Sequence, residues 1–266
     1  METLNFFFDY FLYLMVISNI MKFKISGDNL QVANVSLAKN AVVNAEAGAM
    51  VYKSGNVTID TESKGMGKAF KRILTGESLF LTKLKSVGGA GIAGFGGKIP
   101  GKIKAFELKK GQYIIAEKGA YLCSDTTIDI DLKTVKKVGA ALFGGEGIFL
   151  QKISGPGTVL LHAAGDLIEY NLKKGERLDV DTSHLVAFEP TVDYDIRRVG
   201  SIKTTVFGGE GLFLAQMTGP GKVILQSMTK QMLMGPRMQG GTTHSNMGGT
   251  HTAGSVLGGV LKGMSR

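Results

Sequence analysis

A sixteen-residue block occurs twice in this chain, first from Gly144 and again from Gly208. The two copies read GGEGIFLQKISGPGTV and GGEGLFLAQMTGPGKV, with ten of the sixteen positions identical. A looser copy, GESLFL, begins at Gly76. A motif with such a long period indicates a repeat architecture, in which one unit cannot bury its apolar face alone. Since a unit of about 64 residues makes only a marginal core, we expect three units that pack side by side.

Each Gly-Glu motif follows an aspartate at a fixed distance. The aspartates are Asp60, Asp129 and Asp193, and each precedes the glycine of its Gly-Glu pair (Gly76, Gly145 or Gly209) by the same number of positions. We interpret each aspartate as the end of a strand-like run, the runs being Val57–Asp60, Thr126–Asp129 and Pro190–Asp193. Further upstream stand the related segments Leu37–Asn40, Leu108–Gly111 and Leu172–Gly175. The fixed spacing predicts that the Gly-Glu motif marks the seam of a repeated β-unit.

The residue pattern between these anchors is typical of β-structure. Short runs rich in Val, Ile, Thr and Phe are bounded by Gly and Pro, which favours strands, and Gly-Pro-Gly at 155–157 and 219–221 predicts tight turns. Helical periodicity is weak, with Gly67–Leu74 the best short candidate. We therefore expect an all-β fold of three tandem β-sandwich or double-stranded β-helix-like repeats, packed side by side and forming a ring. The expected units span residues 21–94, 95–163 and 164–228.

The two ends of the chain fall outside the repeats. Residues 1–20 are an apolar extension without the basic start of a signal peptide, and the run Phe6–Ile17 is shorter than the ~20 residues of a spanning helix. Either Met21 is the true start and residues 1–20 are a mis-assigned extension, or the segment touches a membrane. Residues 229–266 form a Gly- and Met-rich tail without aromatic residues, which we expect to be mobile.

The formal net charge of +9 is concentrated in three equivalent segments that precede the Gly-Glu motifs. Their basic residues are Lys64, Lys68, Lys71 and Arg72 in the first, Lys133, Lys136 and Lys137 in the second, and Arg197, Arg198 and Lys203 in the third. In a ring of repeats these residues would form a basic belt. Such a belt would attract anionic lipid or nucleic acid. The alternative is an ordinary solvated surface with spare lysines.

The sequence contains no recognisable catalytic, cofactor or metal site. The match to Gly-x-Gly-x-x-Gly at Gly89, Gly91 and Gly94 lacks the helix that such a fingerprint must open, because further glycines and Pro100 follow it. We interpret Cys123 as a buried structural thiol and His162 and His184 as half-buried strand residues, while His244 and His251 lie in the tail. Glu77, Glu146 and Glu210 recur once per unit, which favours a structural role at the repeat junctions over a ligand-binding one. We expect a protein that is not an enzyme.

The three Gly-Glu-x-x-Phe-Leu units, the start Met-Lys-Phe-Lys-Ile at Met21 and the Gly-rich tail resemble one known family. It is the altered-inheritance-of-mitochondria family of mitochondrial biogenesis, which includes bacterial and archaeal members of unassigned function. The resemblance implies a fold like that of the tryptophan RNA-binding attenuation protein, with three units per chain and a homotrimer of nine units. Eukaryotic relatives are associated with the organisation of the mitochondrial inner membrane. The resemblance carries over no catalytic residues.

Together these features predict a non-enzymatic, homotrimeric β-ring that scaffolds or organises partners. We expect no cofactor, a cytoplasmic location, and itself as the first partner, with an anionic membrane surface as a second. The alternative is a module that binds nucleic acid or small anions through the basic belt, with nucleic acid the less favoured ligand.

Overall fold

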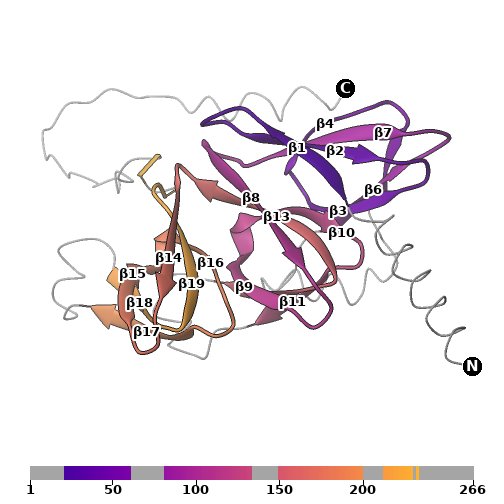
Figure 1. The fold of residues 1–266 in the computed structure, drawn as a ribbon. Coiled ribbons are helices and arrows are strands. Elements are labelled where there is room, and N and C mark those ends of the chain that lie inside the picture. Colours follow the sequence, from indigo (N-terminus) through magenta and orange to yellow (C-terminus); the bar gives the residue numbers. More distant parts are fainter. Residues whose placement is uncertain (1–20, 61–80, 134–148, 200–211, 230–231, 234–266) are drawn as a thin grey trace, which may run out of the picture. The chain divides into compact units, whose positions relative to one another are not determined.

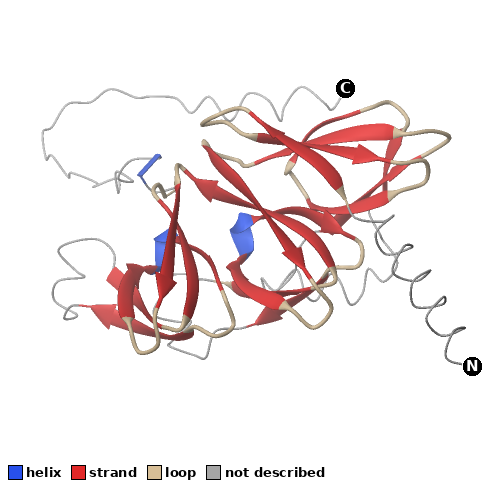
Figure 2. Cartoon of the chain, in the orientation of Figure 1, coloured by secondary structure: helices blue, strands red, loops and turns tan. Residues whose placement is uncertain are grey.

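The computed structural model describes residues 21–60, 81–133, 149–199, 212–229 and 232–233, which lie in one compact unit that ends at Leu233 (Figure 1). Antiparallel strands make up most of this part of the chain, with short 3-10 helices at η1 (Lys118–Ala120) and η2 (Thr182–His184) (Figure 2). The predicted all-β class is therefore confirmed. The best short helical candidate, residues 67–74, lies outside the described residues.

For comparison we divide the strands that follow β1 (Lys22–Ser26) into three consecutive groups of six. The first group is β2 (Val32–Leu37), β3 (Val42–Glu46), β4 (Met50–Lys53), β5 (Val57–Asp60), β6 (Leu81–Ser86) and β7 (Gly91–Gly96). The second group is β8 (Gly101–Leu108), β9 (Tyr113–Glu117), β10 (Tyr121–Asp125), β11 (Asp129–Lys133), β12 (Leu150–Ser154) and β13 (Gly157–Ala164). The third group is β14 (Leu167–Leu172), β15 (Arg177–Asp181), β16 (Leu185–Phe188), β17 (Asp193–Val199), β18 (Leu212–Thr218) and β19 (Gly221–Gln226). The expected unit limits at 94/95 and 163/164 fall inside β7 and β13.

Several matched strands of successive groups begin at the same offset in residue number, although others differ by a few residues. From the second group to the third, β9 to β15 (Tyr113 to Arg177) and β10 to β16 (Tyr121 to Leu185) show the same offset as the two sequence blocks at Gly144 and Gly208. We call it the second offset. From the first group to the second, β3 to β9 and β4 to β10 share a slightly larger one, which we call the first offset. The strands that share these offsets, which are β3, β9 and β15 and also β4, β10 and β16, can therefore be compared residue by residue.

Every group divides its strands between two neighbouring sheets. Sheet A has the order β1-β2-β7-β4, sheet B the order β5-β6-β3-β10-β13-β8, sheet C the order β11-β12-β9-β16-β19-β14 and sheet D the order β15-β18-β17. The two six-stranded sheets thus combine three strands of one group with three of the next. Consecutive groups are consequently joined by backbone hydrogen bonds as well as by side-chain packing.

Three buried apolar clusters fill the space between successive sheets. In β13, Val159, Leu161 and Ala163 belong to the second cluster. Leu160, which alternates with them, belongs to the first. This strand is buried on both faces, which explains its continuous apolar run, because alternating side chains of a strand point to opposite sides.

The recurrent segment after the first strand of each group is a turn. Ala41 N donates to Ala38 O at 2.9 Å, Gln112 N to Lys109 O at 2.9 Å and Glu176 N to Lys173 O at 3.0 Å. The residue before each of these donors has a positive φ, and the three are Asn40 (65°), Gly111 (84°) and Gly175 (78°). Gly and Asn are the residues that accept this left-handed conformation most readily, so the turn requires the Asn or Gly that ends each segment.

The interpretation of Asp129 and Asp193 as strand ends is wrong, although Asp60 does end β5. Asp129 and Asp193 begin β11 and β17, and the residues before them form turns. Ile128 N donates to Asp125 O at 3.2 Å, and Val192 N donates to Glu189 O at 3.0 Å. Thr, Ile and Val favour strands by composition, but these turn hydrogen bonds decide the local structure.

The predicted Gly-Pro-Gly turns are confirmed. Gly155 and Pro156 separate β12 of sheet C from β13 of sheet B, and Gly219 and Pro220 separate β18 of sheet D from β19 of sheet C. These turns therefore pass the chain from one sheet to its neighbour.

Candidate assembly edges and junction pocket

Strands β4 and β15 are terminal strands of their sheets, whereas their equivalents lie inside sheets B and C. In sheet B, β10 pairs with β3 and places Cys123 opposite Ala45. In sheet C, β16 pairs with β9 and places Ala187 opposite Ala116. Within the described strands, β4 lacks the neighbour that β10 and β16 have, and β15 lacks the neighbour that β3 and β9 have. An edge strand presents unpaired backbone groups to which another strand can add.

The residue at the bulge of β4 is exposed, whereas its equivalents are buried. The pairing of β4, β10 and β16 is irregular at the same place in each strand, around Val51, Leu122 and Val186. Leu122 and Val186 are each 2% exposed, and Val51 is 58% exposed. The position thus lies in a core wherever a preceding strand group exists.

Val51 is part of a small apolar surface on the outer face of sheet A. The ring of Tyr52 lies over Gly94 and would overlap a side chain there, and Val51 packs near Gly96. Ile92, two positions before Gly94 in β7, is 49% exposed. We call Val51, Tyr52 and Ile92 the apolar face of sheet A. Large exposed apolar patches mark interaction surfaces, and these three side chains are the candidates for such a surface on sheet A.

The two terminal sheets differ in charge. The strands of sheet A carry Lys22, Lys24 and Lys53 and no acidic residue, a charge of +3. Those of sheet D carry the acidic residues Asp179, Asp181, Asp193 and Asp195 and the basic residues Arg177, Arg197 and Arg198, a charge of −1. Arg197 Nη2 lies 3.1 Å from Asp179 Oδ1, and Gln216 Nε2 donates to the same oxygen at 3.2 Å. Charges of opposite sign favour contact between the two ends.

Most residues of the predicted basic belt lie outside the described residues. This holds for Lys64, Lys68, Lys71, Arg72, Lys136, Lys137 and Lys203, and for the recurrent glutamates Glu77, Glu146 and Glu210. Lys133 ends β11 and Arg198 lies in β17. Arg197 is exposed and paired with Asp179, as described above. The belt therefore stays a prediction.

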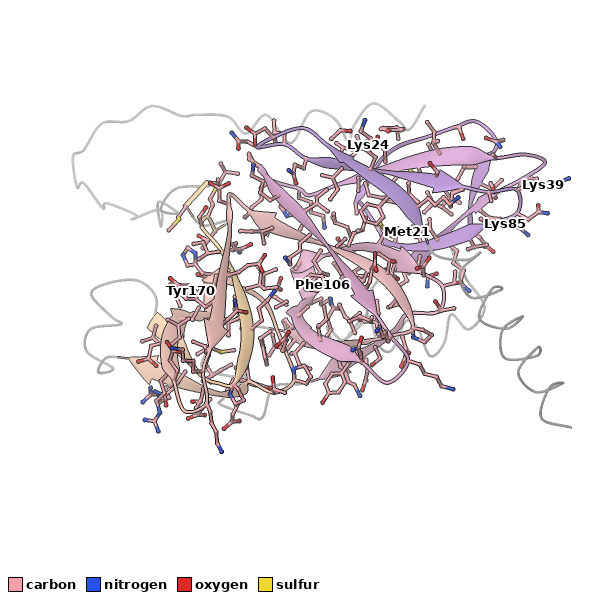
Figure 3. All side chains as sticks on the ribbon, viewed as in Figure 1. Met21, Lys24, Lys39, Lys85, Phe106 and Tyr170 are labelled. Carbon is pink, nitrogen blue, oxygen red and sulfur yellow. The ribbon has the colours of Figure 1, made fainter. Side chains whose placement is uncertain are left out.

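Exposed lysines of the first strand group were missed by the sequence reasoning. Lys39 and Lys85 project from the same end of this group (Figure 3). The turn that contains Lys39 lies against β6, because Ser86 N donates to Ala41 O at 3.1 Å. The alternation of Lys83 and Lys85 in β6 was a usable signal, but it lies after the Gly-Glu motif and not before it.

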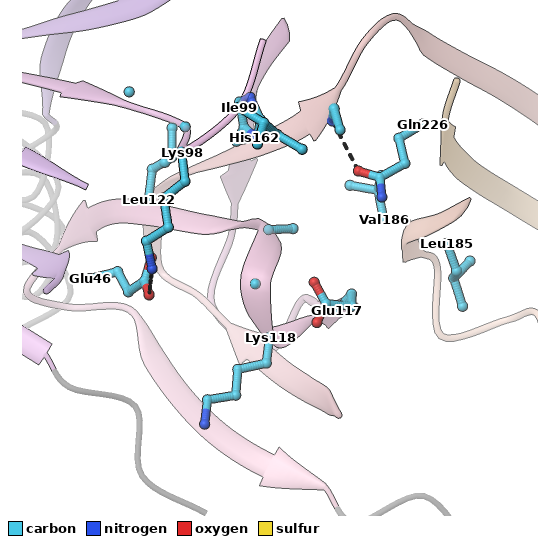
Figure 4. Close-up of a pocket in the computed structure, with 15 residues that line it drawn as sticks. Glu46, Lys98, Ile99, Glu117, Lys118, Leu122, His162, Leu185, Val186 and Gln226 are labelled. Carbon is cyan, nitrogen blue, oxygen red and sulfur yellow. Dashed lines mark hydrogen bonds and ion pairs between the residues drawn. The ribbon is translucent and has the colours of Figure 1, made fainter. Parts of the chain in front are cut away.

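A pocket of about 250 Å³ lies where the three strand groups meet (Figure 4). The first group lines it with Glu46 and with the residues after β7, the second with η1 and His162, and the third with Val186 and Gln226. Lys98 Nζ lies 3.1 Å from Glu46 Oε1. Ala164 N donates to Gln226 Oε1 at 2.9 Å. The first contact joins β3 to the segment after β7, and the second joins the end of β13 to the end of β19.

His162 is the buried titratable side chain of this pocket. It lies in β13, as predicted for a strand histidine, and is 8% exposed. Burial lowers its pKa, and a hydrogen bond with the backbone of Ile99 acts in the opposite direction. Gly97 lies so close to the ring that a side chain at this position would overlap it.

The prediction for His184 is wrong in its secondary structure. His184 ends the 3-10 helix η2 and is not in a strand. Its Nδ1 lies 2.7 Å from the backbone oxygen of Gln226. The side chain of Gln226 donates from Nε2 to Ser183 O at 2.9 Å. His184 and Gln226 therefore fasten η2 to the end of β19.

The described residues do not form an arrangement that indicates metal or thiol chemistry. Cys123 is fully buried, as predicted, and burial raises the pKa of its thiol, which disfavours the reactive thiolate. Gly91 and Gly94 of the glycine motif lie in strand β7, where no helix opens. Within the described ranges, no three His, Cys, Asp or Glu residues are grouped so as to hold a metal ion. No helix in the same ranges is long and apolar enough to cross a membrane.

Comparison with known proteins gives consistent matches over most of the chain. An uncharacterised protein of Streptococcus pyogenes serotype M6 is 29% identical over 241 residues, which cover 87% of this chain and 95% of the relative. A crystal structure of a Streptococcus pyogenes protein, solved by a structural genomics consortium, matches with a TM-score of 0.67 and 27% identity. The match covers 80% of this chain and 96% of the solved one.

The model of one protein family, described as Mitochondrial biogenesis AIM24, matches residues 23–228. These limits include every strand group from β2 to β19. Because the match covers well over half of the sequence, the chain belongs to the Mitochondrial biogenesis AIM24 family.

Proposed function

We propose that this protein is a non-enzymatic scaffold that assembles as a homotrimeric β-ring, with three tandem β-units in each chain. The observation that carries the proposal is the exposure of Val51 at a position where Leu122 and Val186 are buried. A preceding strand group covers that position inside the chain, so a strand group of another copy is its natural cover. Burial of an aliphatic side chain contributes roughly 1.5–3 kcal/mol.

The geometry of this contact favours a ring over a symmetric pair. The last strand group of one copy would meet the first group of the next, which is a head-to-tail interface. Head-to-tail interfaces either close into rings or continue as filaments. Closure after three copies, with nine units around the ring, is the expectation that comes with the family resemblance.

A ring would place the basic belt at equivalent positions around its circumference. Clustered Lys and Arg residues attract anionic lipid headgroups, and this attraction weakens as salt is added. We therefore propose a cytoplasmic scaffold that contacts anionic membrane at its periphery.

A second candidate is a module that binds nucleic acid or small anions. It is favoured by the exposed Lys39 and Lys85, which add positive charge to the first strand group beyond the predicted belt. Phosphate contacts by Lys and Arg are the sequence-independent part of nucleic-acid binding and are equally sensitive to salt.

Flotation with vesicles and RNA shift assays, each run across a salt series, separate these candidates. The test variant changes Lys136, Lys137, Arg197 and Arg198 to Ala. The control changes Lys173 and Lys174, two exposed turn lysines outside the belt. We expect the wild type and the control to float with anionic vesicles at low salt, and the test variant to float several-fold less.

Two other results would contradict the membrane scaffold or the role of the belt. An RNA shift without flotation favours the nucleic-acid module. Equal binding by the test variant and the wild type shows that the belt is only a solvated surface.

A further inference from the structure

We propose the register of the contact between copies: β15 of one copy adds antiparallel to β4 of the next, with Tyr52 opposite Val180 and Lys53 opposite Asp179. This inference rests on the proposed ring and specifies which backbone groups form it. The resulting sheet would have the order β1-β2-β7-β4-β15-β18-β17, which is the order of the matching strands in sheets B and C with β1 added.

The two internal junctions give the same register. In sheet B, Cys123 lies opposite Ala45 and Ser124 lies opposite Asn44. In sheet C, Ala187 lies opposite Ala116 and Phe188 lies opposite Ile115. Adding the second offset to Cys123 of β10 gives Ala187 of β16, and adding the first offset to Ala45 of β3 gives Ala116 of β9. The pair in sheet B is thereby converted into the pair in sheet C.

The same offsets define the third junction. Moving back from β10 to β4 by the first offset takes Cys123 to Tyr52 and Ser124 to Lys53. Moving forward from β9 to β15 by the second offset takes Ala116 to Val180 and Ile115 to Asp179. The bulge at Val51 has the same place in β4 as the bulges in β10 and β16, so no residue is inserted between these reference points.

The side chains of Tyr52 and Val180 leave this edge accessible. Cys123 and Ala187 are small and lie opposite Leu160 and Ile224, whereas Tyr52 lies opposite Gly94. The ring of Tyr52 occupies the space above Gly94, toward β7 and away from the open edge. Val180 is buried in the third core cluster and keeps β15 in place.

The charges select this register over a neighbouring one. Lys53 would face Asp179, whose Oδ1 already accepts from Arg197 and Gln216. Sliding β15 by two positions in one direction would place Lys53 opposite Arg177 instead. Opposite charges directly across an antiparallel pair stabilise it, and like charges destabilise it.

Disulfide trapping in the full chain tests the register. The background variant is Cys123→Ala, which is conservative because Ala187 occupies the equivalent position. Lys53→Cys and Asp179→Cys are added together, and the control pair is Lys53→Cys with Asp181→Cys. Directly opposed residues lie within the span of a disulfide, whereas diagonal neighbours at about 7–8 Å lie beyond it.

Under mild oxidation with copper phenanthroline, we expect covalent dimers and trimers from the 53/179 pair and at least tenfold less product from the 53/181 pair. Mixing the two single variants, Lys53→Cys and Asp179→Cys, should give covalent dimers only, because each copy then has one reactive residue. The pair Ser54→Cys with Leu178→Cys, which the same register places opposite each other, provides a second set if the first does not fold.

The outcomes separate the register from the ring. A protein that is monomeric by light scattering contradicts both. A trimer that gives no product at 53/179 and 54/178, or more product at 53/181, contradicts the register and leaves the ring standing.

Discussion

At the scale of single residues, the left-handed turn positions Asn40, Gly111 and Gly175 show how residue type sets the path between sheets. Each follows a strand that ends in leucine, and each turn carries the chain into the neighbouring sheet. The recurrence of these segments was visible in the sequence, whereas the hydrogen bonds that make them turns were not. The register between distant strands could not be predicted either, because no local pattern states which edge meets which.

Replacement of Gly111 by Ala should lower the free energy of unfolding by about 1 kcal/mol or more, because a Cβ at φ 84° is strained. The matched control is Gly55→Ala, since a Cβ would meet no neighbouring atom at either position and Gly55 has no positive φ. Urea titrations of both variants measure the difference. Equal stability of the two variants would show that the turn does not require its left-handed residue.

His162 should make stability depend on pH. Burial lowers its folded pKa below the value of 6.5 expected in the unfolded chain, so both states are neutral at higher pH. As pH falls from above 6.5 through the folded pKa, the unfolded state binds the proton first and stability is lost. In His162→Gln, which introduces the residue found at the equivalent position 226, this loss should be smaller between pH 7 and 5. Urea unfolding at each pH measures the stability of both proteins. If the stability of the wild type and that of His162→Gln depend on pH in the same way, His162 does not have this role.

At the scale of elements, strands at equivalent positions have two different environments. β10 and β16 lie inside six-stranded sheets, and β4 lies at an edge. The motif spacing predicted repeated strands. It did not reveal that, among the described residues, the first group has no cover over this position, because Val51, Leu122 and Val186 are all apolar and differ only in exposure.

Because of this difference in exposure, replacing valine by aspartate should affect stability at one position and assembly at the other. Val186→Asp should lower the free energy of unfolding by about 3 kcal/mol or more, because it buries an unpaired charge. Val51→Asp should leave the stability of the monomer nearly unchanged and prevent assembly. Thermal unfolding and size-exclusion chromatography of the two variants measure both effects. If Val51→Asp assembles at the same protein concentration as the wild type, the apolar face of sheet A is not the interface.

At the scale of the whole molecule, the chain is a series of sheets whose ends differ in charge, +3 on the strands of sheet A and −1 on those of sheet D. Screening at high salt weakens attraction between exposed charges. We therefore expect assembly to become several-fold weaker between about 0.1 and 1 M salt, on the order of a surface ion-pair effect. A series of sedimentation runs at increasing salt measures this. Assembly that strengthens uniformly with salt would indicate a contact governed by apolar burial alone.

The central claim is that copies of this chain close into a ring through their terminal strands. Light scattering coupled to size-exclusion chromatography tests it most directly, because the chain mass is 28.3 kDa and a trimer has three times that mass. We predict a single trimeric species for the wild type and a monomer for Val51→Asp. A monodisperse wild-type monomer, at concentrations well above those of the cell, would contradict the ring.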